Sequence, residues 1–334
     1  PHLRQVLAAQ QAGLDAQAAI RRGDLAAADR HIGRLHAAHD DLDPEDPARI
    51  ELWTHLENAR SARDNLARAL GAPLAPPLTG RPSGARLRRA AKQLPRDHRA
   101  WVLGDNGITR FVRAMEQRDI ELLADAMELL KEAHDLVDEG SDSRLRYAHC
   151  LGSGHCALAE MQQRLPSVRA RHLAKGIDYL EAALEAAGGP EHRLYAASGL
   201  ALGRALRTRG ELRRDDRAVG RRTGLDALRG HAWAALLQSG TEHAAQAVRE
   251  ATDTAFEVAG WCLRDGAPEE AVRALDACRG LVLHAATTSR TVPERLVAAG
   301  RDDLAEEWHA AGLGTTPDDP LSSLRAPVTV PSSL

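Results

Sequence analysis

Short breaks between amphipathic stretches recur along this chain at nearly even spacing, and this rhythm restricts the possible folds more than any other feature. Each break is polar or contains glycine, and the breaks lie near Gly23, Arg118, Pro166, Gly210 and Gly266. The stretch LGAPLAPPLTGRPSGAR supplies another break near position 71, because proline and glycine stop helices. The spacing predicts a repeating unit of about 48 residues.

A repeat of this length indicates stacked helical hairpins, since a lone hairpin cannot bury its apolar stripe until a neighbour covers it. Each helix has room for about 20 residues, so the unit is similar in kind to the tetratricopeptide repeat (TPR) but longer. We therefore predict an all-α fold, a degenerate TPR-like solenoid of about six hairpins with a C-terminal cap. We expect the solenoid to span 1–311, with a proline-rich insertion at 71–84, and 312–334 to form a linker toward a missing C-terminal domain.

Composition agrees with a helical protein and argues against two kinds of partner. Aromatic residues make up 3% of the 334 residues, while alanine, leucine and arginine dominate, which suits close helix contacts. The 44 basic and 47 acidic side chains give a net charge of −3, without the basic excess of a dedicated nucleic-acid binder. No apolar run approaches the roughly 20 residues that cross a bilayer. We expect a cytoplasmic protein with no membrane partner, and its oligomeric state stays open.

Apolar spacing indicates which side chains two of the helices bury. After the break at 118, one helical face carries Ile120, Leu123, Met127, Leu130 and Val137. After the break at 266, Pro268 can open a helix because its missing N–H does no harm in the first turn. One face of that helix carries Ala271, Leu275, Cys278 and Val282. We expect both faces to lie in the core.

The motif AHCLGSGHC, residues 148–156, admits a metal site, a redox site or the interior of a helix. In a helix His149 and Cys156 would be separated by roughly 11 Å along the axis, too far to share one zinc ion. Gly152 and Gly154 make a metal-binding loop conceivable. The surrounding stretch 144–165 favours the first helix of a hairpin, whose small residues let its partner approach closely. Gly203 and Gly260 are expected to act in the same way in later repeats.

Other chemistry has weaker support. The acidic stretch HDDLDPEDP, residues 39–47, could hold magnesium as in all-helical terpene cyclases, but its prolines and its place between helices favour capping of the next helix. Nucleophile-elbow, P-loop and Rossmann motifs are absent from the sequence. The four cysteines follow no disulfide framework and are expected to be free thiols. No catalytic residue, metal or cofactor is predicted.

Two arginine-rich stretches leave a nucleic-acid alternative open. Residues 81–99 hold seven Arg or Lys side chains against one acidic residue, and residues 204–222 hold eight against three. Either stretch could contact phosphates, but neither contains aromatic residues for base stacking. Arginine stems also cover apolar helix surface, so a solvated or acidic-partner face is favoured.

The stretch APEEAVRALDACRGLVLHAATTSRTVPERLVAAGRDDLAEEWHAAG, residues 267–312, resembles the last repeat before the peptidase-like domain of CHAT proteins, caspase relatives associated with TPR repeats. The matching positions are Ala271, Val272, Leu275, Arg279 and Gly280, then Asp303, Leu304 and Ala305, while Asp276 and Cys278 depart from the usual Glu and Gly. Upstream, RAWVLGDNGITRFVRAMEQRD at 99–119 also resembles actinobacterial members. In that family a His-Cys dyad in the downstream domain is the proposed peptidase site, so none of the cysteines of this chain inherits that role.

The resemblance implies a non-catalytic sensor or scaffold module that recruits partners to a C-terminal CHAT protease-like domain. We expect the first helix of each hairpin to line a groove for a protein or peptide. The candidate partner-binding residues are His149, Ser153, Arg204 and Arg207. A nucleic-acid-associated regulator using 81–99 and 204–222 is the alternative.

Overall fold

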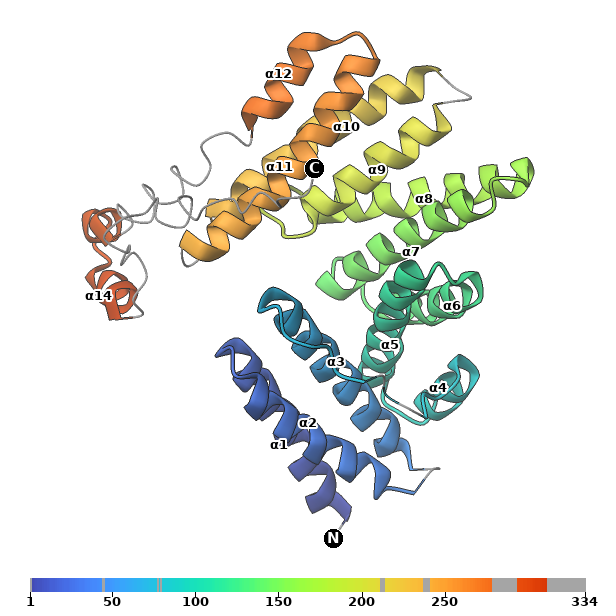
Figure 1. Ribbon diagram of the computed structural model, residues 1–334, viewed down its shortest axis with the longest axis vertical. Coiled ribbons are helices and arrows are strands. Elements are labelled where there is room, and N and C mark those ends of the chain that lie inside the picture. The colour runs from blue at the N-terminus through green and yellow to red at the C-terminus, as the bar shows by residue number, and fades with distance from the viewer. Residues whose placement is uncertain are drawn as a thin grey trace, which may run out of the picture. The chain divides into compact units, whose positions relative to one another are not determined.

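The computed structural model describes residues 2–43, 46–76, 78, 80–210, 214–236, 241–277 and 293–310, and within these ranges every regular element is a helix (Figure 1). The all-α prediction is therefore confirmed. The helices are α1 His2–Arg21, α2 Leu25–Asp40, α3 Pro47–Ala69, α4 Gly84–Ala91, α5 Arg96–Gln117, α6 Ile120–Leu136, α7 Asp142–Met161, α8 Pro166–Ala187, α9 Tyr195–Arg209, α10 Arg214–Leu236, α11 Thr241–Arg264, α12 Pro268–Ala277 and α14 Asp302–Ala310. No helix in the described ranges combines the length and the apolar character needed to cross a membrane.

The helix breaks fall where the sequence predicts them because local signals stop one helix and start the next. Gly23, with a φ of 74°, follows α1, and the Asp24 side chain accepts a hydrogen bond from the Ala27 amide at 2.8 Å to cap α2. Asp119 caps α6 in the same way. In the acidic stretch 39–47, Asp46 caps α3 by accepting from the Ala48 amide at 2.9 Å, as expected from the sequence. The expected insertion at 71–84 falls between α3 and α4, except that Gly84 is the first residue of α4.

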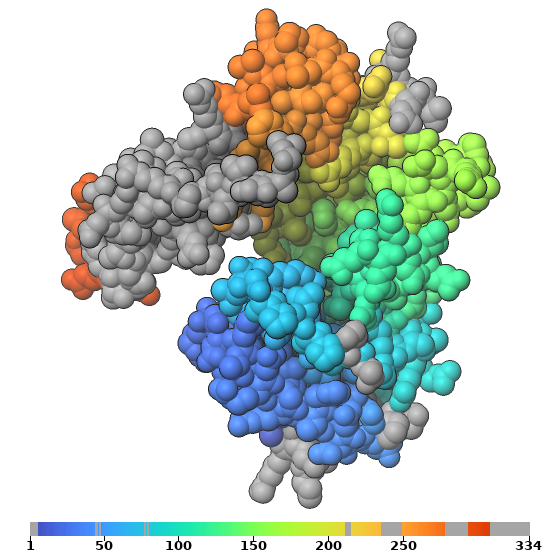
Figure 2. Space-filling model, in the orientation of Figure 1, coloured from blue at the N-terminus to red at the C-terminus, as the bar shows by residue number. Residues whose placement is uncertain are grey.

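Two compact units make up the chain, Pro1–Ala183 and Leu184–Leu334. In the N-terminal unit α1, α2 and α3 pack against one another, α3 contacts α5, α5 and α6 form a hairpin, and α6 contacts α7 (Figures 1 and 2). The C-terminal unit contains the α9–α10 and α11–α12 hairpins, and α10 packs on α11. The boundary lies inside α8, within the range expected to form one domain. The expected linker at 312–334 lies outside the described residues.

The N-terminal core confirms most of the predicted burial in the helix after 118. Leu123 and Leu130 are fully buried, and Met127 is nearly so. Ile120 is 40% exposed, contrary to the expectation, because it is the first residue of α6 and its side chain lies beyond the end of the core. Val137 follows the last helical residue and packs against the same core only in part.

The C-terminal core is built around Val258, Trp261 and Cys262 of α11, together with Ala271 and Ala274 of α12. Leu275 was expected in this core but is 43% exposed, because the neighbouring helices contact the 271 and 274 side of α12. The expected core positions Cys278 and Val282 lie outside the described residues.

The motif at 148–156 lies inside α7, so it forms a helix and not a loop. A Cβ placed on Gly152 would come within 3.0 Å of the Gly176 carbonyl oxygen in α8, which confirms the expected close approach. Gly203 makes an equivalent approach to Gly220. The expectation for Gly260 was wrong, because among the described residues only the side chain of Arg264, in its own helix, lies within 4 Å of the position of a Cβ.

Candidate binding groove

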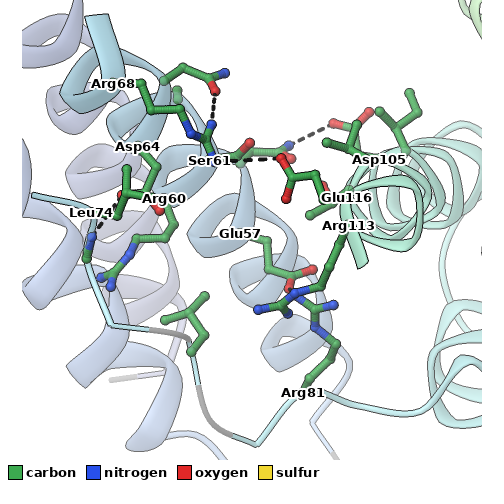
Figure 3. Close-up of a pocket in the computed structure, with 18 of the residues that line it drawn as sticks. Glu57, Arg60, Ser61, Asp64, Arg68, Leu74, Arg81, Asp105, Arg113 and Glu116 are labelled. Atoms are coloured by element: carbon green, nitrogen blue, oxygen red, sulfur yellow. Dashed lines mark hydrogen bonds and ion pairs between the residues drawn. The ribbon is translucent and has the colours of Figure 1, made fainter. Parts of the chain in front are cut away.

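An open groove of about 520 Å³ lies between α3 and α5 in the N-terminal unit (Figure 3). The segment 74–78 and Arg81 form one edge, and Arg146 of α7 closes one end. The lining residues are Glu57, Asn58, Arg60, Ser61, Ala62, Asp64, Asn65, Arg68, Leu74, Ala75, Pro76, Leu78, Arg81, Asp105, Ile108, Thr109, Val112, Arg113, Glu116 and Arg146. Its two main walls are therefore the facing stripes of two helices that are separated in sequence.

Helical spacing explains how each wall presents its side chains. On α5, Asp105, Ile108, Val112 and Glu116 follow one another at three- and four-residue steps and so lie on one face. The lining residues of α3 from Glu57 onward show the same spacing. Half of the lining side chains on these two helices are charged, and most are larger than alanine, so the helices do not approach here as closely as glycine or alanine would allow.

The proline-rich edge of the groove is fixed through its carbonyl oxygens. Proline has no N–H to donate, so such a segment cannot satisfy itself by forming helix or sheet. Arg63 Nη1 donates to the Pro73 carbonyl at 2.8 Å, Arg60 donates to the Pro76 carbonyl, and Arg110 donates to the Pro82 carbonyl. The described residues of this edge, 73–76, 78 and 80–82, are therefore a wall held in the unit by arginines of α3 and α5.

Arg63 also ties this wall to the first hairpin. Its Nε and Nη2 donate to the two carboxylate oxygens of Asp29 in α2, at 2.8 and 3.0 Å. This bidentate hydrogen bonding raises the pKa of the Arg63 guanidinium, which remains charged although the residue is buried. The contact thus links α2, α3 and the proline-rich edge through one side chain.

One end of the groove holds a buried carboxylate beside two guanidinium groups. Glu57 is 3% exposed, and its Oε1 lies 2.5 Å from Arg81 Nη2, although neither carboxylate oxygen accepts a well-directed hydrogen bond. Arg113 lies at the same end (Figure 3). Burial lowers the pKa of Arg81; the charge of Glu57 opposes this shift, and the charges of Arg113 and Arg110 add to it. Positive charge therefore exceeds negative charge locally.

A second charged cluster in the groove is neutralised and fixed. Asp105 accepts a hydrogen bond from Arg146 Nη2 at 3.0 Å and another from Asn58 Nδ2 at 2.8 Å, so α3, α5 and α7 meet at this carboxylate. Elsewhere in the lining, Leu74 is 51% exposed and Val112 is 47% exposed, which adds apolar surface to a polar groove. The groove can thus make both polar and apolar contacts with a ligand.

The four candidate residues from the sequence lie elsewhere. His149 and Ser153 follow Arg146 by three and seven residues on α7, so they continue its face, yet neither lines the groove. Both are half-buried, and burial lowers the pKa of His149. Arg204 and Arg207 belong to the C-terminal unit. The predictions from sequence did not include the lining residues of α3 and α5. The charged and aliphatic residues at helical spacing between 105 and 116 were the one pattern that could have indicated this face of α5.

The two arginines of α9 make ion pairs within their own unit. Arg204 binds both carboxylate oxygens of Glu257, with Nε at 2.7 Å from Oε1. Arg207 donates to Asp265 at 2.5 and 3.1 Å and lies over the Trp261 ring. Its side chain is only 10% exposed, so this guanidinium is already occupied inside the unit.

The histidines of the 148–156 motif have different surroundings. His155 Nδ1 lies 3.0 Å from Nδ1 of His172 in α8, and its ring stacks on Tyr179. Burial, reinforced by the charges of His172 and Lys175, lowers the pKa of His155 to about 4. In the part of the chain that the structure describes, no three His, Cys, Asp or Glu residues gather closely enough to hold a metal ion. Cys150, Cys156 and Cys262 are free thiols, and Cys278 lies outside the described residues.

A second, wider groove of about 1010 Å³ runs over α6, α7 and α8 beside His155 and Tyr179. Its charged rim is largely paired: Arg88 binds Glu128, Arg99 binds Glu132, and Lys131 binds Asp135. This pairing leaves less unbalanced charge for a ligand than the groove between α3 and α5 has.

No protein-family model matches the sequence, and a comparison with curated proteins finds no match. The resemblance to CHAT-associated repeats therefore stays a prediction from the residues quoted above.

Proposed function

We propose that the chain is a non-catalytic binding module, a TPR-like solenoid whose groove between α3 and α5 holds a segment of a protein partner. The observation that carries this proposal is the groove itself, which is open and preformed and combines exposed aliphatic side chains with charged ones. A preformed groove favours binding because little conformational entropy is lost when a ligand enters.

The nucleic-acid alternative gains no support from the arginine-rich stretches. In 81–99, four arginines pair with carboxylates: Arg81 with Glu57, Arg88 with Glu128, Arg96 with Asp138 and Arg99 with Glu132. In 204–222 the pairs are Arg204 with Glu257, Arg207 with Asp265, Arg209 with Asp216 and Arg221 with Glu270. Arginines engaged in this way offer less charge to a phosphate chain.

The role in a larger protein is part of the same proposal. If a CHAT protease-like domain follows residue 334, occupancy of the groove would recruit a partner to it or regulate it. The support is the resemblance of 267–312, of which 278–292 and the last two residues lie outside the described ranges. Reading the gene beyond codon 334 tests this part directly.

The binding proposal is tested by selecting short random peptides displayed on phage against the full chain. Val112→Arg places a long charged side chain in the groove, and Met115→Arg makes the same change on the same helix at an exposed residue outside the lining set. We expect Val112→Arg to weaken selected peptides about tenfold or more and Met115→Arg to leave their affinity unchanged. Failure to enrich any peptide, or equal effects of the two variants, would contradict the proposal.

A further inference from the structure

We propose that the groove between α3 and α5 recognises an acidic peptide segment, with carboxylates of the ligand bound at Arg113 and at Arg60 and an aliphatic side chain of the ligand on Leu74 or Val112. This inference rests on the proposed function and adds the chemical class of the ligand. It follows from the balance of charge in the groove, from two guanidinium groups that lack acidic partners, and from the apolar surface beside them.

The charge balance favours an anionic ligand. Five arginines line the groove against four carboxylates, and one of these carboxylates, Asp64, is paired with Arg63 outside the lining set. Glu57 pairs with Arg81, Asp105 pairs with Arg146, and Glu116 lies 3.7 Å from Arg68. The positive charge that remains belongs to Arg60 and Arg113.

Arg60 and Arg113 approach the groove from its two opposite walls. Arg60, on α3, donates to the Pro76 carbonyl but has no acidic partner in the described ranges. Arg113, on α5, has neither an ion pair nor a hydrogen bond to any described residue, and its charge acts on Arg81. A guanidinium group presents several N–H donors in a plane that matches a carboxylate, so an acidic side chain is the fitting ligand.

The rest of the groove suits a peptide backbone. Ser61 and Thr109 have hydroxyl groups without a hydrogen-bond partner in the described part of the chain, one on each wall. Leu74 and Val112 expose about half of their surface there. An extended peptide could therefore bury an aliphatic side chain and hydrogen-bond through its amides while its acidic group binds the arginines.

Acidic peptide fits better than single-stranded nucleic acid, the other polyanion with this charge. The lining residues include no aromatic side chain on which a base could stack. The four carboxylates in the groove would also repel a chain that carries a phosphate at every nucleotide. A peptide can instead place an acidic side chain at each of the two arginines and neutral residues elsewhere.

Fluorescence anisotropy with fluorescein-labelled hexaglutamate and hexaglutamine tests the inference on the full chain. We expect hexaglutamate to bind, hexaglutamine to bind much more weakly, and added NaCl to weaken the hexaglutamate complex. Arg113→Gln and Arg60→Gln should each weaken hexaglutamate about fivefold. Arg89→Gln, the same change at an exposed residue of α4 outside the groove, should leave affinity unchanged.

Two further variants keep the test decisive if Arg113→Gln lowers stability. Arg113→Lys retains the charge and should recover most of the affinity. Arg113→Glu reverses the charge, so this variant should prefer hexalysine to hexaglutamate. Equal binding of hexaglutamate and hexaglutamine, or equal effects of the Arg113 and Arg89 variants, would overturn the inference. A uridine hexanucleotide that binds more tightly than hexaglutamate and depends on Arg113 would overturn it in favour of nucleic acid.

The peptides selected on phage separate this inference from the proposed function. Selected peptides that lose binding on Val112→Arg and are rich in Asp or Glu would support both. Groove-dependent peptides without acidic residues would overturn the acidic preference and leave the binding function standing. If no selected peptide depends on the groove, both fail.

Discussion

The contact between α9 and α10 and the one between α3 and α5 show two opposite ways for helices of this protein to meet. In the C-terminal unit, Gly203 and Gly220 face each other so closely that a Cβ on either would lie within 3.0 Å of the other's carbonyl oxygen. In the N-terminal unit, facing positions of α3 and α5 carry arginine, aspartate and glutamate, and a groove remains between the helices. Side-chain size at the contact decides whether two helices close together or leave a binding surface.

The comparison also separates two uses of charge. In the C-terminal unit Asp265 is 8% exposed at its side chain and binds both Arg207 and Arg221, so these charges hold α9, α10 and the end of α11 together. In the N-terminal unit Arg60 and Arg113 lie in an open groove and have no acidic partner among the described residues. Paired charges in the protein interior serve packing, whereas unbalanced charge in a groove serves recognition.

Gly203→Val gives the largest expected effect, because it breaks the close contact. Its Cβ would lie 2.9 Å from the Gly220 carbonyl oxygen and 3.1 Å from the Trp261 ring, and backbone cannot move aside as a flexible side chain can. We expect the free energy of unfolding to fall by about 3 kcal/mol in urea titrations followed by tryptophan fluorescence. Gly260→Val in α11, where no described residue outside the helix lies within 4 Å of the position of a Cβ, is the matched control and should cost far less. Equal losses would refute the role of the contact.

The α7–α8 contact should make stability depend on pH. Gly152 and Gly176 bring these helices close enough for His155 and His172 to meet, and the pKa of His155 falls to about 4. Because the unfolded chain binds this proton more readily, stability is retained above pH 6.5 and is lost as pH falls toward 4. We expect a loss of about 2 kcal/mol between pH 7 and pH 5 from this group.

Two histidine variants measure that dependence. His155→Gln should flatten the curve of unfolding free energy against pH, because it removes the group whose pKa is lowered. His98→Gln, at a histidine whose side chain is 62% exposed, should leave the slope unchanged. Indistinguishable slopes in the two variants would show that the His155 pair does not control acid stability.

Gly33→Ala gives the smallest expected effect and has the opposite sign. Gly33 lies on the exposed side of α2 with no atom close to where its Cβ would be. Alanine should raise the free energy of unfolding by about 0.5–1 kcal/mol, since glycine costs more backbone entropy in a helix. Gly152→Ala should lower it, because its Cβ would come within 2.5 Å of Leu180. The same shift for both, measured by urea denaturation, would contradict the distinction between packed and unpacked glycines.

Local signals in the sequence were sufficient to predict the breaks near 23, 118, 166, 210 and 266, but the breaks at 92–95 and 188–194 were not predicted. Glycine after a helix and aspartate before the next act within a few residues, so Gly23 and Asp24 could be interpreted without knowledge of the fold. Burial was harder to predict: the spacing of Leu275 placed it on an apolar face, but only the neighbouring helices decide which part of that face is covered. The TPR-like solenoid itself stays a prediction.

The groove depends on residues that are distant in sequence. Asn58 meets Asp105 across 47 positions, and Arg207 meets Asp265 across 58. Spacing within one helix cannot reveal such partners, so Arg207 seemed available for a ligand although it is paired. For the same reason the sequence did not predict that this proline-rich insertion forms an edge of the groove. Its own residues do not indicate which arginines, distant in sequence, will bind its carbonyl oxygens.

The anchoring of residues 73–82 has a consequence for how this protein can diversify. Arg60, Arg63 and Arg110 bind backbone oxygens, which every amino acid provides, so these anchors place no demand on the side chains of the wall. Substitutions at Leu74 or Ala75 can therefore change the surface of this edge while the helical scaffold keeps its contacts. The edge can thus vary in sequence without loss of the backbone hydrogen bonds that hold it in place.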